Sequence, residues 1–325
     1  MVATIRIHHT GGPEVLALDD VELPPPARGE ARVAHSAIGV NFIDCYHRSG
    51  LYPLPGLPHG LGSEAVGRVE ALGEGVHGLA VGDRVAYAGG VVPGSYAAAR
   101  NVPAWRLVPV PAAVDDVSMA ASLLKGMTAE FLVRRVFKVG PGHRVLVHAA
   151  AGGVGTLLSQ WLRHVGATVV GVVSTAAKAD VAYAAGCHHV VVRASDDVAD
   201  AVARFTQGRG VDVCYDSVGK DTLRESLRCL RKRGLLVSFG NSSGRPDPVA
   251  LAELQEGSFF LTRPTLNDYT STRNELLHAA EVFGKLLAGG VLRPLLHGTF
   301  PLAEAAAAHR LLESRATTGA LVLLP

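Results

Sequence analysis

The chain has 325 residues, of which 48% are hydrophobic and 18% charged, and its formal net charge is +2. A chain of this length is typical of two domains, and so large an apolar fraction excludes intrinsic disorder. The cationic residues are dispersed. Their densest run, 228–233, is typical of a solvated helix end, which argues against nucleic-acid binding as the main function. No run of about 18 apolar residues occurs, so no membrane-spanning helix is expected.

The cysteines are far apart in the sequence and form no C-x-x-C pair: Cys45, Cys187, Cys214 and Cys229. A structural zinc site built on paired cysteines is therefore not expected. The first 15 residues lack the continuous apolar core of a secretion signal. We expect reduced, buried thiols in a cytoplasmic protein.

The first 110 residues or so are rich in short β-forming runs and turns. Segments 31–41 and 65–73 are β-forming, and Gly82 with Asp83 predicts a turn into a further strand. Prolines between residues 24 and 58 divide the region into short pieces. This part shows no regular alternation of strands and helices.

From residue 117 the pattern changes, and helical apolar spacing over 117–137 is followed by alternating strands and helices. Strands are expected at 144–149, 167–174, 188–192, 211–219, 235–240 and 259–264. Helices are expected between them at 156–166, 177–186, 195–208 and 223–234. Such alternation predicts an α/β fold, a Rossmann doubly wound parallel sheet with helices on both faces.

The last segments break the alternation, with a long helix at 272–290, a strand at 297–301, a helix at 303–314 and a strand at 320–325. We expect the pieces after residue 290 to complete the first domain. The predicted domains are therefore 1–121 together with 291–325, and a Rossmann domain at 122–290.

A glycine-rich turn over 148–155 follows the first strand of the alternating region and leads into a helix at Thr156. In the G-x-G-x-x-G pattern Ala150 takes the first position, Gly152 the second and Gly155 the third. Gly152 would let the backbone approach a pyrophosphate, and Gly155 would let the helix pack closely on the strand. Free N–H groups at the helix start favour phosphate. The sequence therefore predicts a dinucleotide site.

The end of the second strand distinguishes the two nicotinamide cofactors. NAD sites carry an acidic residue about 20 positions after the glycines to hold the ribose hydroxyls. Here Ser174 and Thr175 occupy that place, and no acid occurs before Asp180. Lys178 follows, and Arg193 lies just past the third strand, so both cations suit a 2′-phosphate. These residues favour NADPH over NADH.

A second motif, Gly240-Asn241-Ser242-Ser243-Gly244, matches the G-x-S-x-G pattern of serine hydrolases. A nucleophile elbow must lead directly into a helix, whereas Pro246 and Pro248 follow here and disfavour one. A hydrolase is therefore a poor alternative.

Eight segments, in order, closely resemble bacterial NADPH:quinone oxidoreductases of the zeta-crystallin-like branch of the zinc-free medium-chain dehydrogenase/reductase superfamily. They span nearly the whole chain: NFIDCYHRSGLYP (41–53), GLGSEAVG (60–67), SLLKGMT (122–128), AAAGGVG (149–155), YDSVG (215–219), SFGNSSG (238–244), TRPTL (262–266) and LESRATTG (312–319).

The resemblance implies a GroES-like substrate domain with both chain ends, an inserted Rossmann domain, an active site in the cleft between them, and a homodimer. It implies cofactor contacts at Asn41, Phe42, Ile43, Asp44, Tyr46, Thr128, Phe131, Gly152, Gly153, Val154, Gly155, Ser174, Thr175, Lys178, Ser217, Gly240, Asn241, Ser242, Arg263, Pro264, Thr265 and Arg315. Two residues depart from the pattern, because Arg193 and Phe131 stand where close relatives carry tyrosine.

Alcohol dehydrogenases of the same superfamily hold a catalytic zinc, with Gly-His-Glu where this chain has Gly62-Ser63-Glu64. Serine is a poor zinc ligand, and Asn41 replaces the first ligand cysteine, so no metal is expected. Without a Lewis acid, an acceptor already activated by conjugation is favoured.

The predicted reaction is therefore hydride transfer from NADPH to a quinone or a similar conjugated carbonyl. Asn41 would orient the nicotinamide ribose or the substrate oxygen, and Tyr46, Tyr52 or a water would supply a hydrogen bond or proton. Two alternatives remain open: an NADPH-dependent enone or enoyl reductase, and a non-catalytic NADPH- or RNA-binding crystallin-like protein.

Overall fold

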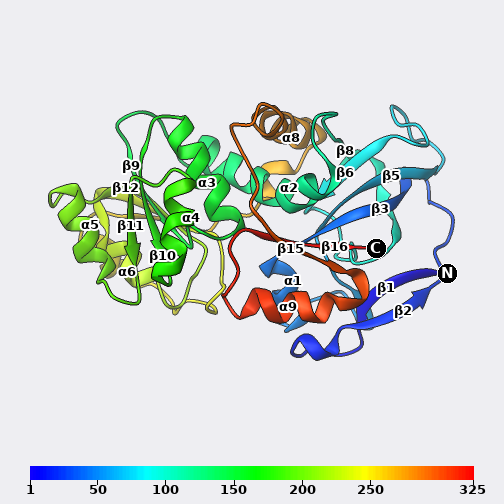
Figure 1. Ribbon diagram of the computed structural model, residues 1–325, viewed down its shortest axis with the longest axis horizontal. Coiled ribbons are helices and arrows are strands. Elements are labelled where there is room, and N and C mark those ends of the chain that lie inside the picture. The colour runs from blue at the N-terminus through cyan, green and yellow to red at the C-terminus, as the bar shows by residue number, and fades with distance from the viewer. The chain divides into compact units, whose positions relative to one another are not determined.

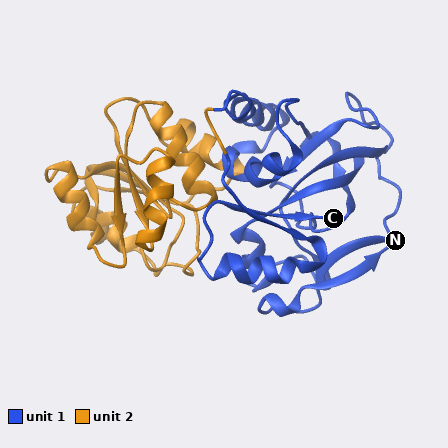
Figure 2. Cartoon of the chain, viewed as in Figure 1, with its two compact units in different colours: residues 1–127, 269–290, 294–325 blue, residues 128–268, 291–293 orange.

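The computed structural model describes all residues from Met1 to Pro325. The chain forms two compact units (Figure 2). Unit 1 comprises residues 1–127, 269–290 and 294–325, and unit 2 comprises residues 128–268 and 291–293. In chain order, unit 2 is thus an insertion into unit 1. None of the helices combines the length and apolar character needed to cross a bilayer.

Unit 1 contains two sheets. The larger one has seven strands in the order β15-β16-β3-β5-β6-β8, with β7 paired to β3, and the smaller one has the order β2-β1-β4. The strands are β1 (Val2–Ile7), β2 (Ala17–Val21), β3 (Glu30–Val40), β4 (His59–Gly60), β5 (Glu64–Leu72), β6 (Arg84–Ala88), β7 (Ala99–Pro103), β8 (Val108–Pro109), β15 (Leu296–Pro301) and β16 (Ala320–Leu324). The return of β15 and β16 to this unit was expected from the sequence.

The helices of unit 1 are α1 (Phe42–Arg48), α8 (Arg273–Ala288), α9 (Ala305–Glu313) and most of α2 (Asp116–Phe131). Short 3-10 helices lie at Pro13–Val15, Ala104–Arg106 and Leu302–Glu304. Alternating strand residues such as Val33 and Val85 are buried together with α9 residues such as Leu312, which gives this unit its core.

Unit 2 is built on a six-stranded sheet in the order β11-β10-β9-β12-β13-β14. Every pairing in this sheet is parallel. Its strands are β9 (Arg144–His148), β10 (Thr168–Val173), β11 (His189–Val192), β12 (Val211–Asp216), β13 (Leu230–Ser238) and β14 (Phe260–Thr262). In sequence order this is 3-2-1-4-5-6, the Rossmann arrangement, whose ligand lies where the order reverses, between β9 and β12. The predicted fold class is confirmed.

Helices cover both faces of this sheet (Figure 1). One face packs on α5 (Val198–Thr206) and α6 (Leu223–Arg228) through a cluster that includes Leu146, Val170 and Val202. The other packs on α3 (Gly153–His164) and α4 (Ala179–Ala184). The remaining elements are a π-helical turn at Leu132–Val136, a 3-10 turn at Ala176–Lys178 and α7 (Leu251–Gln255).

The basic run 228–233 differs from the prediction. The helix expected at 223–234 ends at Arg228, and β13 begins at Leu230. Arg231 is drawn into the sheet because its Nε donates to Asp212 Oδ1 of β12 at 2.5 Å. Arg233 has φ of +60°, which breaks regular structure at that point. The run is therefore the start of a strand with a specific ion pair rather than a solvated helix end.

Helix α8 was assigned by sequence to the Rossmann domain, and it packs within unit 1 instead. Phe283 is fully buried against Gly126 of α2, where a Cβ would lie only 2.1 Å from the ring. At the helix start Arg273 donates to the carbonyl oxygens of Trp105 and Leu107. Partners far away in sequence thus decide where this helix belongs.

Candidate functional site

The glycine-rich turn joins β9 to α3 in unit 2. Ala149 takes a left-handed conformation with φ of +51°, Gly152 caps the helix, and α3 begins at Gly153 rather than at Thr156 as expected. The first amide donating within this helix is that of Thr156, to Gly152 O at 2.9 Å. The N–H groups of the first helical turn therefore have no carbonyl partner within the helix and are suited to an anion.

The two glycines of this motif are packed differently. A Cβ on Gly155 would lie 2.1 Å from Ala149 O, which only a glycine avoids. A Cβ on Gly152 would have as its closest contact the same oxygen at 3.2 Å. The chain itself thus requires glycine strictly at position 155, whereas close approach of a ligand is the stronger reason for glycine at 152.

The loops after β12 and β13 are joined at the carboxyl edge of the sheet. Ser242 N donates to Ser217 O at 3.3 Å, and Ser243 N donates to Val218 O at 2.9 Å. Gly240 allows the close approach, because a Cβ there would lie 2.3 Å from Ser217 O. Three predicted contacts, Ser217, Gly240 and Ser242, are therefore brought together.

Asp216, which the sequence reading did not single out, organises the first of these loops. Its buried carboxylate accepts from the N–H groups of Val218 and Gly219 and from the hydroxyls of Thr222 and Ser226. An acid at the end of an apolar strand is the signal that could have revealed it.

The hydrolase motif forms no nucleophile elbow. Ser242 lies beyond the end of β13 at Ser238, and no helix follows until α7 begins at Leu251. A serine held on a strand-to-helix turn is the geometry that this activity needs. The segment serves instead as one of the two joined loops.

The residues predicted for the 2′-phosphate lie after β10 and β11. Ser174 and Thr175 are exposed directly after β10, and Lys178 ends the short 3-10 turn that follows. Partial burial lowers the pKa of Lys178. Arg193 is already engaged, because its Nε lies 3.3 Å from Glu225 Oε1 and its Nη2 donates to Asp221 O. Arg193 therefore already has partners on α6 and in the loop before it.

Other predicted residues of unit 2 lie in the last turn of α2 and directly after β14. Thr128 and Phe131 are buried in the last turn of α2. Arg263 follows β14, and its Nη1 donates to the carbonyl oxygens of Ser238 at 2.9 Å and Gly240 at 3.2 Å. Pro264 and Thr265 come next in the chain, and Thr265 Oγ1 donates to Asp268 Oδ2 at 3.0 Å.

In unit 1 the predicted residues gather around α1. The rings of Tyr46 and Tyr52 meet edge to face with centroids 5.2 Å apart, and Phe42 lies 6.3 Å from Tyr46. The same helix carries Ile43, whereas Arg315 follows α9 with φ of +58°. The structure thus brings the rings of the two tyrosines into contact.

Asn41 caps α1 and is held by two buried carboxylates. Its backbone N–H donates to Asp44 Oδ2 at 2.9 Å, and its side-chain Nδ2 donates to Glu64 Oε1 at 2.8 Å. Glu64 also accepts from Lys125 Nζ at 2.8 Å and from the N–H of Leu124 at 2.7 Å. Lys125 was overlooked in the sequence, although a single lysine within an apolar helix is a recognisable signal.

Asp44 is the end of a buried hydrogen-bonded chain. It accepts from Ser63 Oγ at 2.6 Å and from the Tyr96 hydroxyl at 3.0 Å. Tyr96 in turn lies 2.9 Å from His309 Nε2, and His309 Nδ1 lies 3.0 Å from Arg48 Nη1. Because Arg48 can only donate, the proton of a neutral His309 is on Nε2. None of these long-range contacts is visible in sequence spacing.

Burial shifts the pKa values of two groups in this hydrogen-bonded series, Asp44 and His309. It raises the pKa of Asp44 to about 6, although three hydrogen bonds oppose the shift. Burial, together with the charge of Arg48, lowers the pKa of His309 to about 3. His309 is therefore neutral at physiological pH, and Arg48 is balanced by Glu313, which it contacts at 2.7 Å.

The positions that would carry zinc ligands in related dehydrogenases are occupied otherwise. The Ser63 hydroxyl is committed to Asp44, and the Asn41 amide is committed to Glu64. No group of three or more His, Cys, Asp or Glu side chains comes together in a way that could hold a metal ion. All four cysteines are buried as free thiols.

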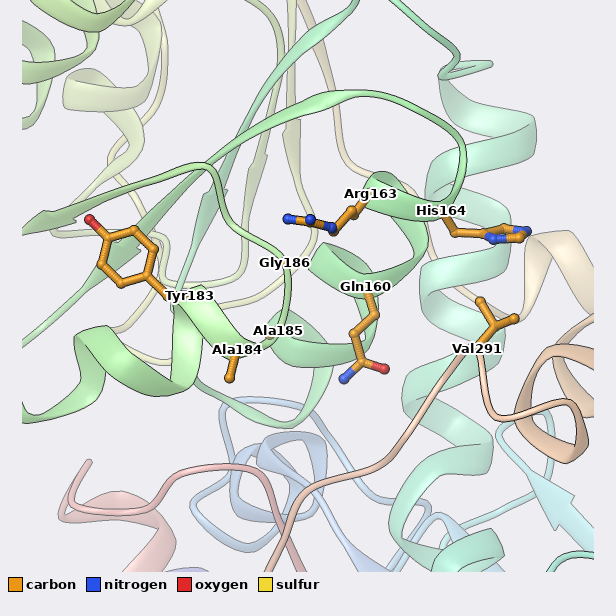
Figure 3. Close-up of a pocket in the computed structure, with 8 residues that line it drawn as sticks. All are labelled: Gln160, Arg163, His164, Tyr183, Ala184, Ala185, Gly186 and Val291. Atoms are coloured by element: carbon orange, nitrogen blue, oxygen red, sulfur yellow. The ribbon is translucent and has the colours of Figure 1, made fainter.

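A shallow hollow of about 470 Å³ lies elsewhere on unit 2, lined by Gln160, Arg163, His164, Tyr183, Ala184, Ala185, Gly186 and Val291 (Figure 3). It is formed by the C-terminal half of α3, the end of α4 with the two residues that follow it, and Val291, the third residue after α8. The glycine turn is at the other end of α3, so this hollow is not part of the candidate cofactor site.

Comparison with known families defines the class of the protein. Residues 27–112 match the alcohol dehydrogenase GroES-like domain, and residues 153–283 match the zinc-binding dehydrogenase family. The first match lies within unit 1, and the second covers most of unit 2 and continues to residue 283, within α8 of unit 1. The chain is thus of the class that joins a GroES-like domain to a Rossmann domain.

Relatives of known activity extend over the whole chain. Quinone oxidoreductase 1 of Escherichia coli K12 is 45% identical over 328 residues, covering 100% of both chains. A 2-haloacrylate reductase from a Burkholderia species is also 45% identical, covering 100% of this chain and 99% of that protein.

Solved structures of quinone oxidoreductases and related proteins have the same fold as this chain. The E. coli quinone oxidoreductase complexed with NADPH superposes with a TM-score of 0.97 at 45% identity, over 99% of this chain and 100% of that one. A mycobacterial protein complexed with NADPH gives a TM-score of 0.96 at 43% identity, over 100% of both chains. The chain belongs to the quinone oxidoreductase family of the medium-chain dehydrogenase/reductase superfamily, which confirms the resemblance noted from its motifs.

Proposed function

We propose that the protein catalyses NADPH-dependent reduction of quinones. The observation that carries this proposal is the full-length match to quinone oxidoreductases at 45% identity, one of them solved as its NADPH complex. The glycine turn, the joined loops and the Asn41–Tyr52 segment all fall within that match. The fold alone would support only dinucleotide binding.

The residues present in unit 2 fit NADPH. Gly155 allows the tight packing that opens the first turn of α3 to a pyrophosphate, and that turn has N–H groups without helical partners. The end of β10 carries Ser174 and Thr175 in place of an acid, with Lys178 close behind. A carboxylate there would repel a 2′-phosphate, whereas a lysine attracts one.

When bound, NADPH would supply a hydride to the acceptor. The chain's own groups would position the reactants and donate hydrogen bonds, without a metal ligand set. Tyr46 and Tyr52, paired edge to face beside Asn41 in sequence, are the proposed donors to the acceptor oxygen. A quinone suits such a site because conjugation already stabilises the negative charge that hydride addition creates.

A second substrate class has its own support. The 2-haloacrylate reductase relative is as similar to this chain as the quinone reductase, at 45% identity. An acrylate and a quinone both contain a carbon–carbon double bond conjugated to a carbonyl, so a similar hydride-accepting geometry serves either. A bulky quinone and a small acrylate differ mainly in the volume of the substrate pocket.

Steady-state oxidation of NADPH distinguishes these candidates. We expect turnover with 1,4-benzoquinone and 1,4-naphthoquinone that exceeds turnover with 2-chloroacrylate and with a simple enone at equal concentration. Preference for 2-chloroacrylate would favour the second class. Tight NADPH binding without turnover of any acceptor would contradict the proposal and support a non-catalytic, crystallin-like role.

We further propose a cytoplasmic homodimer. Four buried free thiols suit a reducing compartment.

Strand β14 is the last strand of its sheet, and Phe260 on it is 61% exposed. An exposed apolar edge strand invites pairing with a second copy. We expect light scattering to give the dimer mass, and Phe260→Lys to shift it towards the monomer; an unchanged dimer would place the interface elsewhere.

A further inference from the structure

The donors and acceptors around Asn41 decide what its side chain can bind. Nδ2 donates to Glu64 Oε1 at 2.8 Å and approaches Gly39 O at 3.5 Å. Both partners are acceptors only, so the nitrogen must face them and the amide cannot be flipped. Asn41 is 6% exposed, the N–H of Asp44 donates to its backbone oxygen at 3.0 Å, and its side-chain oxygen makes no capping hydrogen bond to α1. The group left to bind a ligand is therefore an acceptor.

Glu64 is built into this arrangement. It is fully buried, and its carboxylate accepts from Lys125 Nζ, from Leu124 N–H and from Asn41. Gly39 makes room for it, because a Cβ there would lie 2.2 Å from Glu64 Oε1. All three of these groups are donors, so the carboxylate acts as an acceptor toward each of them.

Burying an ion pair such as Glu64 with Lys125 is a poor way to stabilise a fold, since the desolvation of both charges offsets their attraction. A role in orienting another group explains its presence better. Asp44 fixes the backbone of Asn41 in the same manner, through the N–H at 2.9 Å. Two carboxylates thus hold one residue, one at the main chain and one at the side chain.

We propose that Glu64, held by Lys125, fixes Asn41 as a hydrogen-bond acceptor for a hydroxyl or amide donor on the nicotinamide half of NADPH. Glu64 and Lys125 are positioning residues in this scheme. The substrate oxygen, which needs a donor, is left to the tyrosines. This inference rests on the proposed function, and it chooses between the two roles that the sequence left open for Asn41.

Equilibrium binding without an acceptor tests the proposal. We expect Asn41→Leu, which keeps the shape and removes the acceptor, to weaken NADPH binding by about 10- to 100-fold. Binding of 2′,5′-ADP, which lacks the nicotinamide half, should stay within about twofold. The matched control is Asn274→Leu at an exposed position on α8, which should change neither ligand.

A double-mutant cycle tests the positioning role. Glu64→Gln lets the Asn41 amide turn, because one side of the new amide can donate to the Asn41 oxygen. We expect it to weaken NADPH binding by roughly 3- to 10-fold and to add nothing to Asn41→Leu. Glu64→Asp, which keeps the charge but withdraws the acceptor, should behave alike and serves if Glu64→Gln does not fold. Additive losses would overturn the positioning role.

The identity of the donor follows from one analogue. The 3-acetylpyridine analogue of NADP⁺ lacks the carboxamide N–H. If Asn41 accepts from the carboxamide, Asn41→Leu will leave binding of this analogue unchanged. If Asn41 accepts from a ribose hydroxyl, Asn41→Leu will weaken binding of the analogue as much as binding of NADP⁺. Both results support the acceptor role.

The opposite outcome is equally clear. If Asn41→Leu leaves NADPH affinity intact and lowers only kcat/KM for the quinone, Asn41 acts on the substrate and the inference is wrong. If the unaltered protein binds no NADPH, the proposed function itself fails first.

Discussion

Gly152 and Gly155 lie in the same turn, yet a methyl group added at each would meet very different surroundings. At Gly155 it would lie 2.1 Å from a backbone oxygen, which cannot move away without distorting the turn. At Gly152 the closest atom would be 3.2 Å away. Gly155 is needed to fold the turn, whereas the turn leaves more room for a side chain at Gly152.

These surroundings predict different phenotypes for two similar variants. Gly155→Ala should destabilise unit 2 by about 1–3 kcal/mol, as overpacking does. Gly152→Ala should keep the melting temperature within a few degrees and weaken NADPH at least about 10-fold, because its methyl group would occupy the approach of the pyrophosphate. Thermal unfolding and NADPH titration of both variants check this. Equal loss of stability in the two would contradict it.

Lys178, which follows β10, is the residue proposed to hold the 2′-phosphate. Lys178→Ala should weaken NADPH by about 10- to 100-fold and NADH by less than about twofold, because only NADPH has the 2′-phosphate that Lys178 would hold. Lys138→Ala, at an exposed loop position, is the matched control. Fluorescence titration with both cofactors measures the ratio. If both cofactors weaken equally, Lys178 does not bind the phosphate.

Helices α2 and α8 show how one contact assigns an element to a unit. Gly126 faces the ring of Phe283, which is fully buried, so the helices approach more closely than an alanine would allow. Helix propensity favours alanine over glycine by about 1 kcal/mol. The contact opposes that preference, and the balance of the two decides the sign of the substitution.

We expect the contact to prevail. Gly126→Ala should destabilise unit 1 by about 1–3 kcal/mol. Adding Phe283→Leu should recover part of that loss, since the smaller side chain gives the new methyl group space. Denaturant unfolding of the two single variants and the double variant measures the coupling. If Gly126→Ala makes the protein more stable, the ring of Phe283 can move aside at little energetic cost.

Much of the element order was predictable because apolar periodicity is a local property. The strand–helix alternation of unit 2 follows from it. The end of α6 was not predictable, because it depends on a contact distant in sequence: Arg231 donates to Asp212 on the neighbouring strand β12. Within the site, motif positions such as Gly155 could be identified from sequence. The Glu64–Lys125 pair could not, because it joins residues that lie 61 positions apart.

At the scale of the whole molecule, three buried groups of unit 1 couple its stability to pH. Burial lowers the pKa of His35 to about 4 and that of His309 to about 3, from an ordinary value of 6.5. Burial raises the pKa of Asp44 to about 6 from 3.8. Near pH 5 the unfolded chain therefore binds two imidazole protons, whereas the folded chain binds one on Asp44. Unfolding takes up about one net proton, so stability rises with pH.

The free energy of unfolding of unit 1 should accordingly fall by about 1.4 kcal/mol for each pH unit between roughly pH 6 and pH 4.5. His35→Gln keeps a donor and an acceptor but does not titrate, and it should make the slope clearly smaller. The two tryptophans lie in different units, Trp105 in unit 1 and Trp161 in unit 2. Trp161→Phe therefore makes fluorescence report on unit 1 alone. An unchanged slope in His35→Gln would show that His35 protonates without cost.

Strand β16 has a consequence for how the polypeptide is made. It pairs with β3 through Leu321–Leu323 opposite Ile38–Val40, so nearly the whole chain is synthesised between the two partners. On the ribosome, Ile38–Val40 must remain an unpaired apolar edge while all of unit 2 emerges and folds, because domains fold as units once their residues are available. Such an edge is an aggregation hazard until it is covered. The growing polypeptide is therefore most vulnerable at Ile38–Val40, and the synthesis of Leu321–Leu323 ends that exposure.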